Sequence, residues 1–336
     1  MAESHKGRNY CLDFIKGMAC ICIVFMHCKF PGTLGNMFQC VTRFGVPYFF
    51  MISGYFSYYE DGRKFDAGKK VKHILIIAVA ASVFYLVVGI AEMLILKTPF
   101  SFSVRQIASF LIFNQPIFIA EHLWFLYALI YVYILYAIVD RFNLHKIAYY
   151  SIPVLLLGYI ALAQVRFLIT GHATIIYYRN FLMEGFPVFM IGHLIHKYKE
   201  KLITKLTNIH LIILISVFTL LCVAECLFLG RDFGANIFTF PQLTAIFIFA
   251  VKNSTFMSKN ILTDFGKKYS LFVYVLHWFV WKSVELLFTK TGLTDYTATL
   301  YLMPFAVAIL SVLLSIIVEK AISAIYGRNR NKEVRA

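Results

Sequence analysis

Apolar residues follow one another in long runs that recur from one end of the chain to the other. A transmembrane helix needs about 20 mostly apolar residues, and ten segments come close to that length. They are residues 10–28, 40–58, 73–96, 123–139, 147–165, 181–196, 209–229, 237–251, 269–288 and 298–324. The pattern predicts an all-α fold, a polytopic membrane helical bundle of about ten transmembrane helices. Segment 105–119 is also apolar, but it is short and contains Pro116, so we expect a re-entrant or interfacial piece there.

The composition excludes an ordinary soluble protein and a disordered one. Of the 336 residues, 60% are hydrophobic and 15% are charged, whereas an average soluble domain is about 45–50% apolar and about 25% charged. No linker, low-complexity tract or soluble domain interrupts the apolar runs. We therefore expect residues 1–336 to form a single integral membrane domain.

The net charge of +15 would indicate a nucleic-acid partner in a soluble protein, but its distribution points elsewhere. With a cytoplasmic N-terminus, 21 of the 32 Lys and Arg residues fall in inner segments, eight fall in outer segments and three lie within spans. Inner loops of membrane proteins carry such an excess of basic residues. The count predicts that both termini are cytoplasmic, that the lipid bilayer is the partner and that no nucleic acid is bound.

The first apolar segment carries three ionisable residues, Asp13, Lys16 and His27. Ionisable residues within spans are costly and therefore indicate function. Asp13 and Lys16 are three residues apart and close enough to pair. Lys16 and His27 are eleven residues apart, which places them on one helix face about 16 Å apart along the axis. The alternative is that Lys16 reaches the inner interface and His27 marks the outer one.

Further polar residues lie at the ends of other spans. Lys69 and Lys72, at helical spacing before the third span, form a basic patch that either binds phosphates or only orients the chain. His122 begins the fourth span and Arg179 precedes the sixth. These two, His27 and Glu184 are candidates for one outward-facing polar cluster, although they come from different spans.

Seven cysteines do not form a disulfide framework. Cys28 and Cys40 bracket the first outer loop, so they are placed to pair in an oxidising compartment. The alternative is that they act as small buried hydrophobic residues. No Cys/His spacing resembles a zinc site, and we expect no metal.

The chain resembles the integral membrane acyltransferase family 3, which includes bacterial O-acetyltransferases of surface polysaccharides. The resemblance rests on several sequence motifs and on the order in which they follow one another along the chain. The family signature is Leu-Asp, then Arg or Lys, ten residues and His, matched here by Leu12, Asp13, Lys16 and His27. Lys16 stands where many members have Arg, which loses the bidentate fork. The segments VPYFFMISGYF, HLWFL, RN, FPVFMIG and YVLH follow in family order.

The resemblance implies an acetyl-CoA-dependent O-acyltransferase in the bacterial inner membrane. The donor, acetyl-CoA or another short acyl-CoA, would be held from the cytosol with its phosphates at Lys16, Lys69 and Lys72. His27 would act on a hydroxyl of an extracytoplasmic or lipid-linked glycan, either as a general base or through an acyl-histidine intermediate, with Asp13 on the same helix. Arg179 or His122 would stabilise the oxyanion or orient the sugar.

A transporter or flippase for a polar small molecule or a lipid-linked sugar is the alternative. Ten spans with intramembrane charges also suit that function. It predicts movement of substrate without any acyl-CoA.

Overall fold

The computed structural model describes residues 8–96, 104–114, 121–230 and 233–333. These residues form helices joined by turns, and no β-strand occurs among them, which confirms the all-α prediction. The chain divides into two compact units. Unit 1 comprises Met1–Gly45, Thr207–Asp232 and Ala245–Ala336, and unit 2 comprises Val46–Leu206 and Phe233–Thr244. The expectation of one membrane domain stays a prediction.

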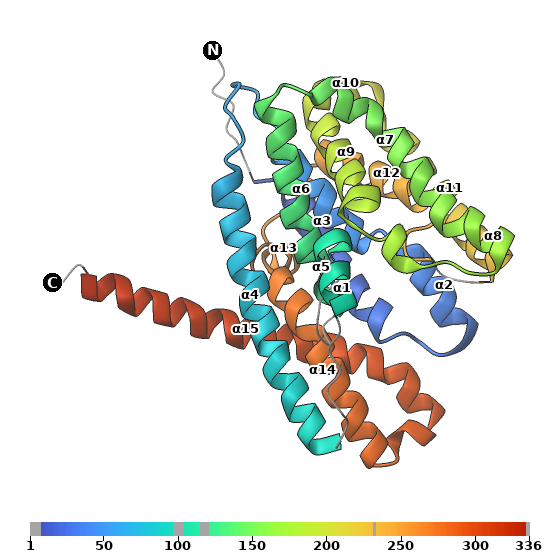
Figure 1. Ribbon diagram of the computed structural model, residues 1–336, viewed down its shortest axis with the longest axis vertical. Coiled ribbons are helices and arrows are strands. Elements are labelled where there is room, and N and C mark those ends of the chain that lie inside the picture. Colours follow the sequence, from blue (N-terminus) through green and yellow to red (C-terminus); the bar gives the residue numbers. More distant parts are fainter. Residues whose placement is uncertain (1–7, 97–103, 115–120, 231–232, 334–336) are drawn as a thin grey trace. The chain divides into compact units, whose positions relative to one another are not determined.

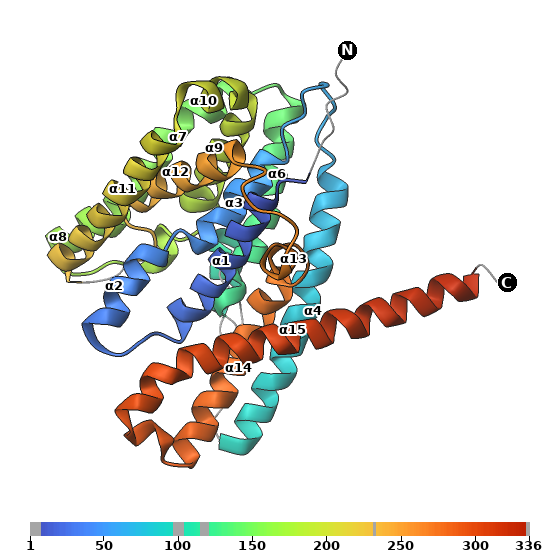
Figure 2. The same cartoon turned by 180° about the vertical axis from the view of Figure 1, so that it is seen from behind.

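Unit 1 contains the helices from both ends of the chain. They are α1 (Tyr10–His27), α2 (Gly32–Thr42), α11 (Asn208–Leu229), α13 (Ile261–Lys268), α14 (Ser270–Lys290) and α15 (Thr297–Glu333). The unit boundary falls within α12 (Thr239–Lys252). The short 3-10 turn η5 (Leu293–Asp295) joins α14 and α15, which lie side by side, and α2 lies against α11 (Figures 1 and 2).

Helix α1 is anchored to the short helix α13. The side chain of Asn9 caps α1 by accepting the backbone N–H of Leu12 at 2.9 Å. Farther along, Gly17 faces Gly266, and a Cβ atom on Gly266 would lie 1.8 Å from the Asp13 carbonyl oxygen. Only glycine permits that approach. Gly266 therefore allows the backbones of α1 and α13 to come into contact, which fixes the position of α1 against α13.

Unit 2 holds the middle of the chain. Its α-helices are α3 (Gly45–Tyr55), α4 (Ala67–Leu96), α5 (Val104–Phe113), α6 (Trp124–Arg141), α7 (His145–Ile160), α8 (Arg166–Thr170), α9 (Phe186–Lys197) and α10 (Lys199–Lys205). Its shorter turns are η1 (Glu121–Leu123), η2 (Ala161–Val165), η3 (Ile175–Tyr177) and η4 (Phe181–Gly185), of which η2 and η4 are π-helical.

The core of unit 2 is a close crossing of α3 and α9. A Cβ atom on Gly54 of α3 would lie 1.8 Å from the Phe189 carbonyl oxygen, and one on Gly192 of α9 would lie 2.0 Å from that of Met51. Met51 and Phe189 are fully buried there. Small residues that let apolar helices approach so closely are typical of membrane helix pairs.

Among the residues that the structure describes, seven helical stretches are long and apolar enough to cross a membrane. They are Tyr10–His27, Ala67–Ile95, Glu121–Arg141, His145–Thr170, Asn208–Leu229, Ser270–Lys290 and Thr297–Ala324. The other three predicted spans fall on shorter apolar helices: α3, α9 with its preceding turn η4, and α12. The chain is therefore a multi-pass helical protein, while the count of ten and the orientation of the termini stay predictions.

The predicted second span, 40–58, is divided between two helices. Helix α2 ends at Thr42 and α3 begins at Gly45. Pro47 lacks a backbone N–H, so it cannot bond to the carbonyl group of Arg43 four residues earlier, which favours the break. Of the predicted re-entrant segment 105–119, the structure describes α5, and Pro116 lies outside the described residues.

Candidate functional site

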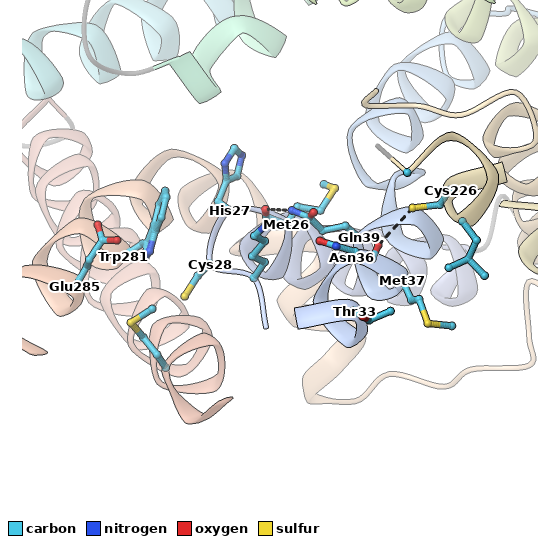
Figure 3. A pocket seen from close by; sticks show the side chains of 14 residues that line it. Met26, His27, Cys28, Thr33, Asn36, Met37, Gln39, Cys226, Trp281 and Glu285 are labelled. Atoms are coloured by element: carbon cyan, nitrogen blue, oxygen red, sulfur yellow. Dashed lines mark hydrogen bonds between the residues drawn. The ribbon is translucent and has the colours of Figure 1, made fainter. Parts of the chain in front are cut away.

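A cavity of about 690 Å³ lies in unit 1 at the C-terminal end of α1. Its walls come from that end and the turn after it, together with α2, α11, α14 and α15. Figure 3 shows His27 between Trp281 and Glu285 of α14 on one side and Asn36 and Gln39 of α2 on the other. The volume falls within the range of small-molecule sites, about 300–1,000 Å³.

His27 is the last residue of α1 and is partly exposed to this cavity. Its imidazole contacts three rings of α14. The ring centroid lies 5.1 Å from that of His277 and 5.2 Å from that of Trp278, with Trp281 farther away at 6.4 Å. One side of the imidazole is therefore packed against aromatic rings while the residue also lines an open space.

His277 is completely buried, and its protonation pattern follows from its partners. Nδ1 lies 2.8 Å from the carbonyl oxygen of Tyr274 and 3.1 Å from that of Val273. A carbonyl oxygen only accepts hydrogen bonds, so Nδ1 must carry the hydrogen and donate. In the neutral ring Nε2 is then an acceptor, on the edge of the imidazole that faces away from the helix backbone.

The turn after α1 is held by a buried amide. Gln39 of α2 is 8% exposed, and its Nε2 donates to the Met26 carbonyl oxygen at 2.8 Å. This bond satisfies one of the carbonyl groups that a helix leaves without a partner at its C-terminal end. Because Met26 directly precedes His27, Gln39 helps to fix where the imidazole lies.

Trp281 and Glu285 continue the cavity wall along α14. They follow His277 at intervals of four residues, so the three side chains form one stripe on that helix. The Glu285 carboxylate accepts from Lys282 Nζ at 2.8 Å, and this ammonium lies 4.2 Å from the Trp281 ring centroid. The wall thus offers an aromatic face and a carboxylate next to a space that His27 also lines.

A disulfide joins the two helices on the other side of the cavity. Cys40 of α2 is bonded to Cys226 of α11, and Cys226 lines the cavity. Of the two alternatives left open for Cys28, the pairing with Cys40 is excluded, because Cys28 is a free, buried thiol. The packing of α2 against α11 presents Cys40 to a residue distant in sequence, which spacing along the chain does not reveal.

A family model described as an acyltransferase domain matches residues 9–320. The chain belongs to acyltransferase family 3. No curated protein and no solved structure matches it significantly. As a member of this family it is an acyltransferase, and the cavity at His27 is its candidate active site.

At the opposite end of α1, this acyltransferase holds Asp13 in an ion-pair network. The Arg8 guanidinium binds the Asp13 carboxylate, and it also lies 2.9 Å from Asp264 on α13. The hydrogen bond from Arg8 holds the pKa of Asp264 below its ordinary value. Within the described residues no salt bridge joins Asp13 to Lys16, the pair expected from the sequence. Asp13 is paired with Arg8 instead.

The three lysines expected to hold the acyl donor belong to different units. Lys16 is partly buried on α1 in unit 1. Lys69 and Lys72 are exposed in the first two turns of α4 in unit 2, where Asp66 caps the helix by accepting the Lys69 backbone N–H at 3.0 Å. Their joint contact with a donor stays a prediction.

His122 and Arg179 both lie in unit 2, near the start of α6. His122 is 2% exposed, and its ring packs edge-on against Tyr85 with centroids 4.9 Å apart. The Arg179 guanidinium lies over the Trp124 ring, 5.3 Å from its centroid. The structure thus brings Arg179 to a residue two positions after His122, and the predicted cluster itself stays a prediction. Its relation to His27 stays a prediction.

The sequence reading missed the residues that surround His27. No role was assigned to His277, Trp281 or Glu285 from the sequence. One signal was available: His277, Trp281 and Glu285 recur every four residues on an otherwise apolar helix. A polar stripe at helical spacing indicates a face turned towards a cavity rather than lipid.

Proposed function

We propose that this chain transfers an acetyl or other short acyl group from cytosolic acyl-CoA to a hydroxyl of an extracytoplasmic or lipid-linked glycan. One observation carries the proposal: a partly exposed His27, backed by the buried His277, lines a cavity of about 690 Å³. An imidazole with an unperturbed pKa of about 6.5 is suited to general acid–base catalysis.

In the proposed reaction, His27 accepts the proton of the sugar hydroxyl. The hydroxyl oxygen attacks the thioester carbonyl carbon, so that a C–O bond forms and the C–S bond breaks. The imidazolium then returns its proton to the CoA sulfur, which regenerates His27. An acyl-histidine intermediate is the alternative route, with His27 itself attacking the thioester before the sugar does.

The donor would reach His27 along α1. Lys16 and His27 are eleven residues apart, about 16 Å along the helix axis, a separation that suits an extended pantetheine arm. Lys16, together with Lys69 and Lys72, would neutralise the phosphates of the donor at the cytosolic end. In this proposal Arg179 or His122 stabilises the oxyanion or orients the sugar.

The cavity wall suits a sugar ring as acceptor. The Trp281 ring offers a flat apolar surface, while Glu285, Asn36 and Gln39 supply hydrogen-bonding groups around the same space. Sites for small molecules combine apolar and aromatic walls with a few such polar groups.

The disulfide between Cys40 and Cys226 supports the placement of this cavity on the extracytoplasmic side. Disulfides persist in oxidising compartments and are rare in the cytosol. Both cysteines lie at ends of helices that the distribution of basic residues also assigns to the outside. We therefore propose a bacterial inner-membrane protein with ten spans and with both termini in the cytoplasm.

The test is acetyl-CoA hydrolysis and glycan acetylation by the purified protein, wild type against His27→Ala. Removal of a general base is expected to lower the rate about 10²- to 10⁴-fold. The matched control is His172→Ala, which removes an exposed imidazole from a loop of unit 2. Undiminished activity of His27→Ala contradicts the role of His27.

The transporter alternative makes two different predictions. Substrate movement without acyl-CoA, and no thermal stabilisation of the protein by CoA, would favour a transporter.

A further inference from the structure

A second cavity, of about 280 Å³, lies within unit 2. Its lining comes from the loop after α3, the C-terminal end of α6 and the turn that follows it, the start of α7 and the end of α9. None of these segments carries a residue assigned above to acyl transfer. The cavity needs its own explanation.

Its inner wall is a chain of hydrogen bonds centred on His193, which is 2% exposed. The Tyr136 hydroxyl donates to the Ser57 carbonyl oxygen at 3.3 Å, so it accepts from His193 Nε2 at 2.7 Å. His193 Nδ1 then accepts from the Tyr149 hydroxyl at 2.9 Å. Both nitrogens of His193 are thereby occupied, and the wall is polar and fixed in place.

His145 forms the adjoining part of the wall and has a nitrogen without a protein partner. Its ring stacks on that of His193, with an interplanar angle of 15° and centroids 5.6 Å apart. Nε2 lies 3.5 Å from Asp140 Oδ1. Nδ1 is buried and makes no hydrogen bond to any described residue. Buried polar atoms are nearly always bonded, so Nδ1 indicates that something else occupies the cavity.

The charge around the cavity favours an anion. Arg63, Lys64 and Lys197 line it and are exposed, and the Lys197 ammonium lies 5.1 Å from the Tyr149 ring centroid. Asp140 is the carboxylate of the lining, and its Oδ2 already accepts the backbone N–H of Phe65 at 2.9 Å. Arg63 already pairs with Asp61 at 2.7 Å, so Lys64 and Lys197 supply the positive charge that the lining offers to a ligand.

We propose that this cavity binds the phosphate group of a small phosphorylated molecule. Lys64 and Lys197 neutralise the phosphate. His145, protonated on both nitrogens with Nε2–H towards Asp140, donates a hydrogen bond from Nδ1–H to one of the phosphate oxygens. Hydrogen bonds between charged groups and phosphate are the strong ones in proteins. Sites that enclose a whole ligand measure about 300–1,000 Å³, so this smaller cavity takes the phosphate end and leaves the rest of the molecule at its mouth.

The phosphate has two possible sources, a soluble phosphate ester and the headgroup of an anionic lipid. The basic-residue distribution assigns all the lining segments to the cytoplasmic side, where both sources occur. The site does not depend on the chemistry proposed for His27, so His27→Ala protein is expected to bind phosphate like the wild type.

The first experiment measures how ligands protect lysines of the full-length protein from an amine-acylating reagent, with mass spectrometry as readout. In lipid-free detergent the probes are inorganic phosphate and ADP, with adenosine as the control without phosphate. In nanodiscs the probe is phosphatidic acid, compared with pure phosphatidylcholine. Protection of Lys64 and Lys197, but not of Lys201 and Lys205 on the neighbouring α10, supports the site. The probe that protects identifies the source. Absence of protection by every phosphate-bearing probe, or equal protection of the cavity lysines and the two α10 lysines, overturns the proposal.

The second experiment compares phosphate affinity between matched variants. Lys64→Gln with Lys197→Gln removes two charges from the cavity, and the affinity for the protecting ligand is expected to fall about tenfold or more. Lys201→Gln with Lys205→Gln removes the same charge from exposed positions of α10 and is expected to leave the affinity unchanged. Equal affinity of the two double variants overturns the assignment. Lys64 and Lys197 line the cavity, whereas Lys201 and Lys205 do not. All four side chains are exposed, so neither double variant is expected to impair folding.

Discussion

The pairing of His27 with His277 is the residue-scale feature with the most chemical consequence. His277 is buried, and its Nδ1 hydrogen is committed to backbone carbonyl groups of its own helix. The ring centroids of His27 and His277 lie 5.1 Å apart, so the two imidazoles pack against each other. In catalytic triads a neighbouring group orients the base through a hydrogen bond; here the contact is between two rings. We infer that His277 positions His27 and does not itself contact the substrate.

Replacement of His277 by Phe tests this positioning role. The ring volume is retained while both nitrogens are lost, so kcat is expected to fall about 10- to 100-fold, part of what a general base contributes. KM for the acceptor is expected to stay unchanged, because His277 is buried behind His27. Steady-state kinetics on the purified variant measure both constants, with the thermal unfolding midpoint as a check of folding. A change confined to the unfolding midpoint would show a purely structural role.

At the element scale, the short helices carry most of the tight packing. Helices α3 and α9 are too short to be spans by length, yet their crossing brings glycine and carbonyl groups into contact at Gly54 and Gly192. Residues around the crossing, such as Met51 and Phe189, are fully buried. A helix enclosed by its neighbours does not have to match the thickness of the hydrocarbon layer, which explains why unit 2 has short helices at its centre.

The crossing predicts a sharp difference between two glycine substitutions. A methyl group at Gly54 would lie 1.8 Å from a backbone oxygen, so Gly54→Ala forces the helices apart and is expected to cost about 1–3 kcal/mol. At Gly68, in the first turn of α4, the nearest atom is an Asp66 carboxylate oxygen at 3.7 Å. Gly68→Ala is therefore expected to be neutral or stabilising by up to about 1 kcal/mol. Thermal unfolding in detergent compares the two, and equal midpoints would contradict the crossing.

At the scale of the whole molecule, the apolar helices and the distribution of charge describe how the chain meets the membrane. In the described part of the chain, seven helices suffice in length and composition to cross it. The excess of Lys and Arg in alternate connecting segments predicts which ends are cytoplasmic. The disulfide between Cys40 and Cys226 supplies an independent indication of the outer side.

Cysteine labelling of intact cells tests this orientation. The five free cysteines are all buried, so the unmodified protein is expected to react weakly with a membrane-impermeant maleimide. Thr291→Cys, in an exposed turn predicted to be outside, is expected to react in intact cells. Lys259→Cys, in an exposed segment predicted to be inside, is expected to react only after permeabilisation. The reverse pattern would invert the topology, and with it the side to which the His27 cavity faces.

By itself the sequence determined the all-α class, the positions of the apolar segments and the alignment of Lys16 with His27. These properties follow from local composition and from helical periodicity, which act over a few turns. Only the tertiary structure decided which side chains surround His27, that Cys40 pairs with Cys226 and that α3 crosses α9 at two glycines. Each of these joins residues far apart along the chain, and the packing of helices, rather than any spacing in sequence, brings them together.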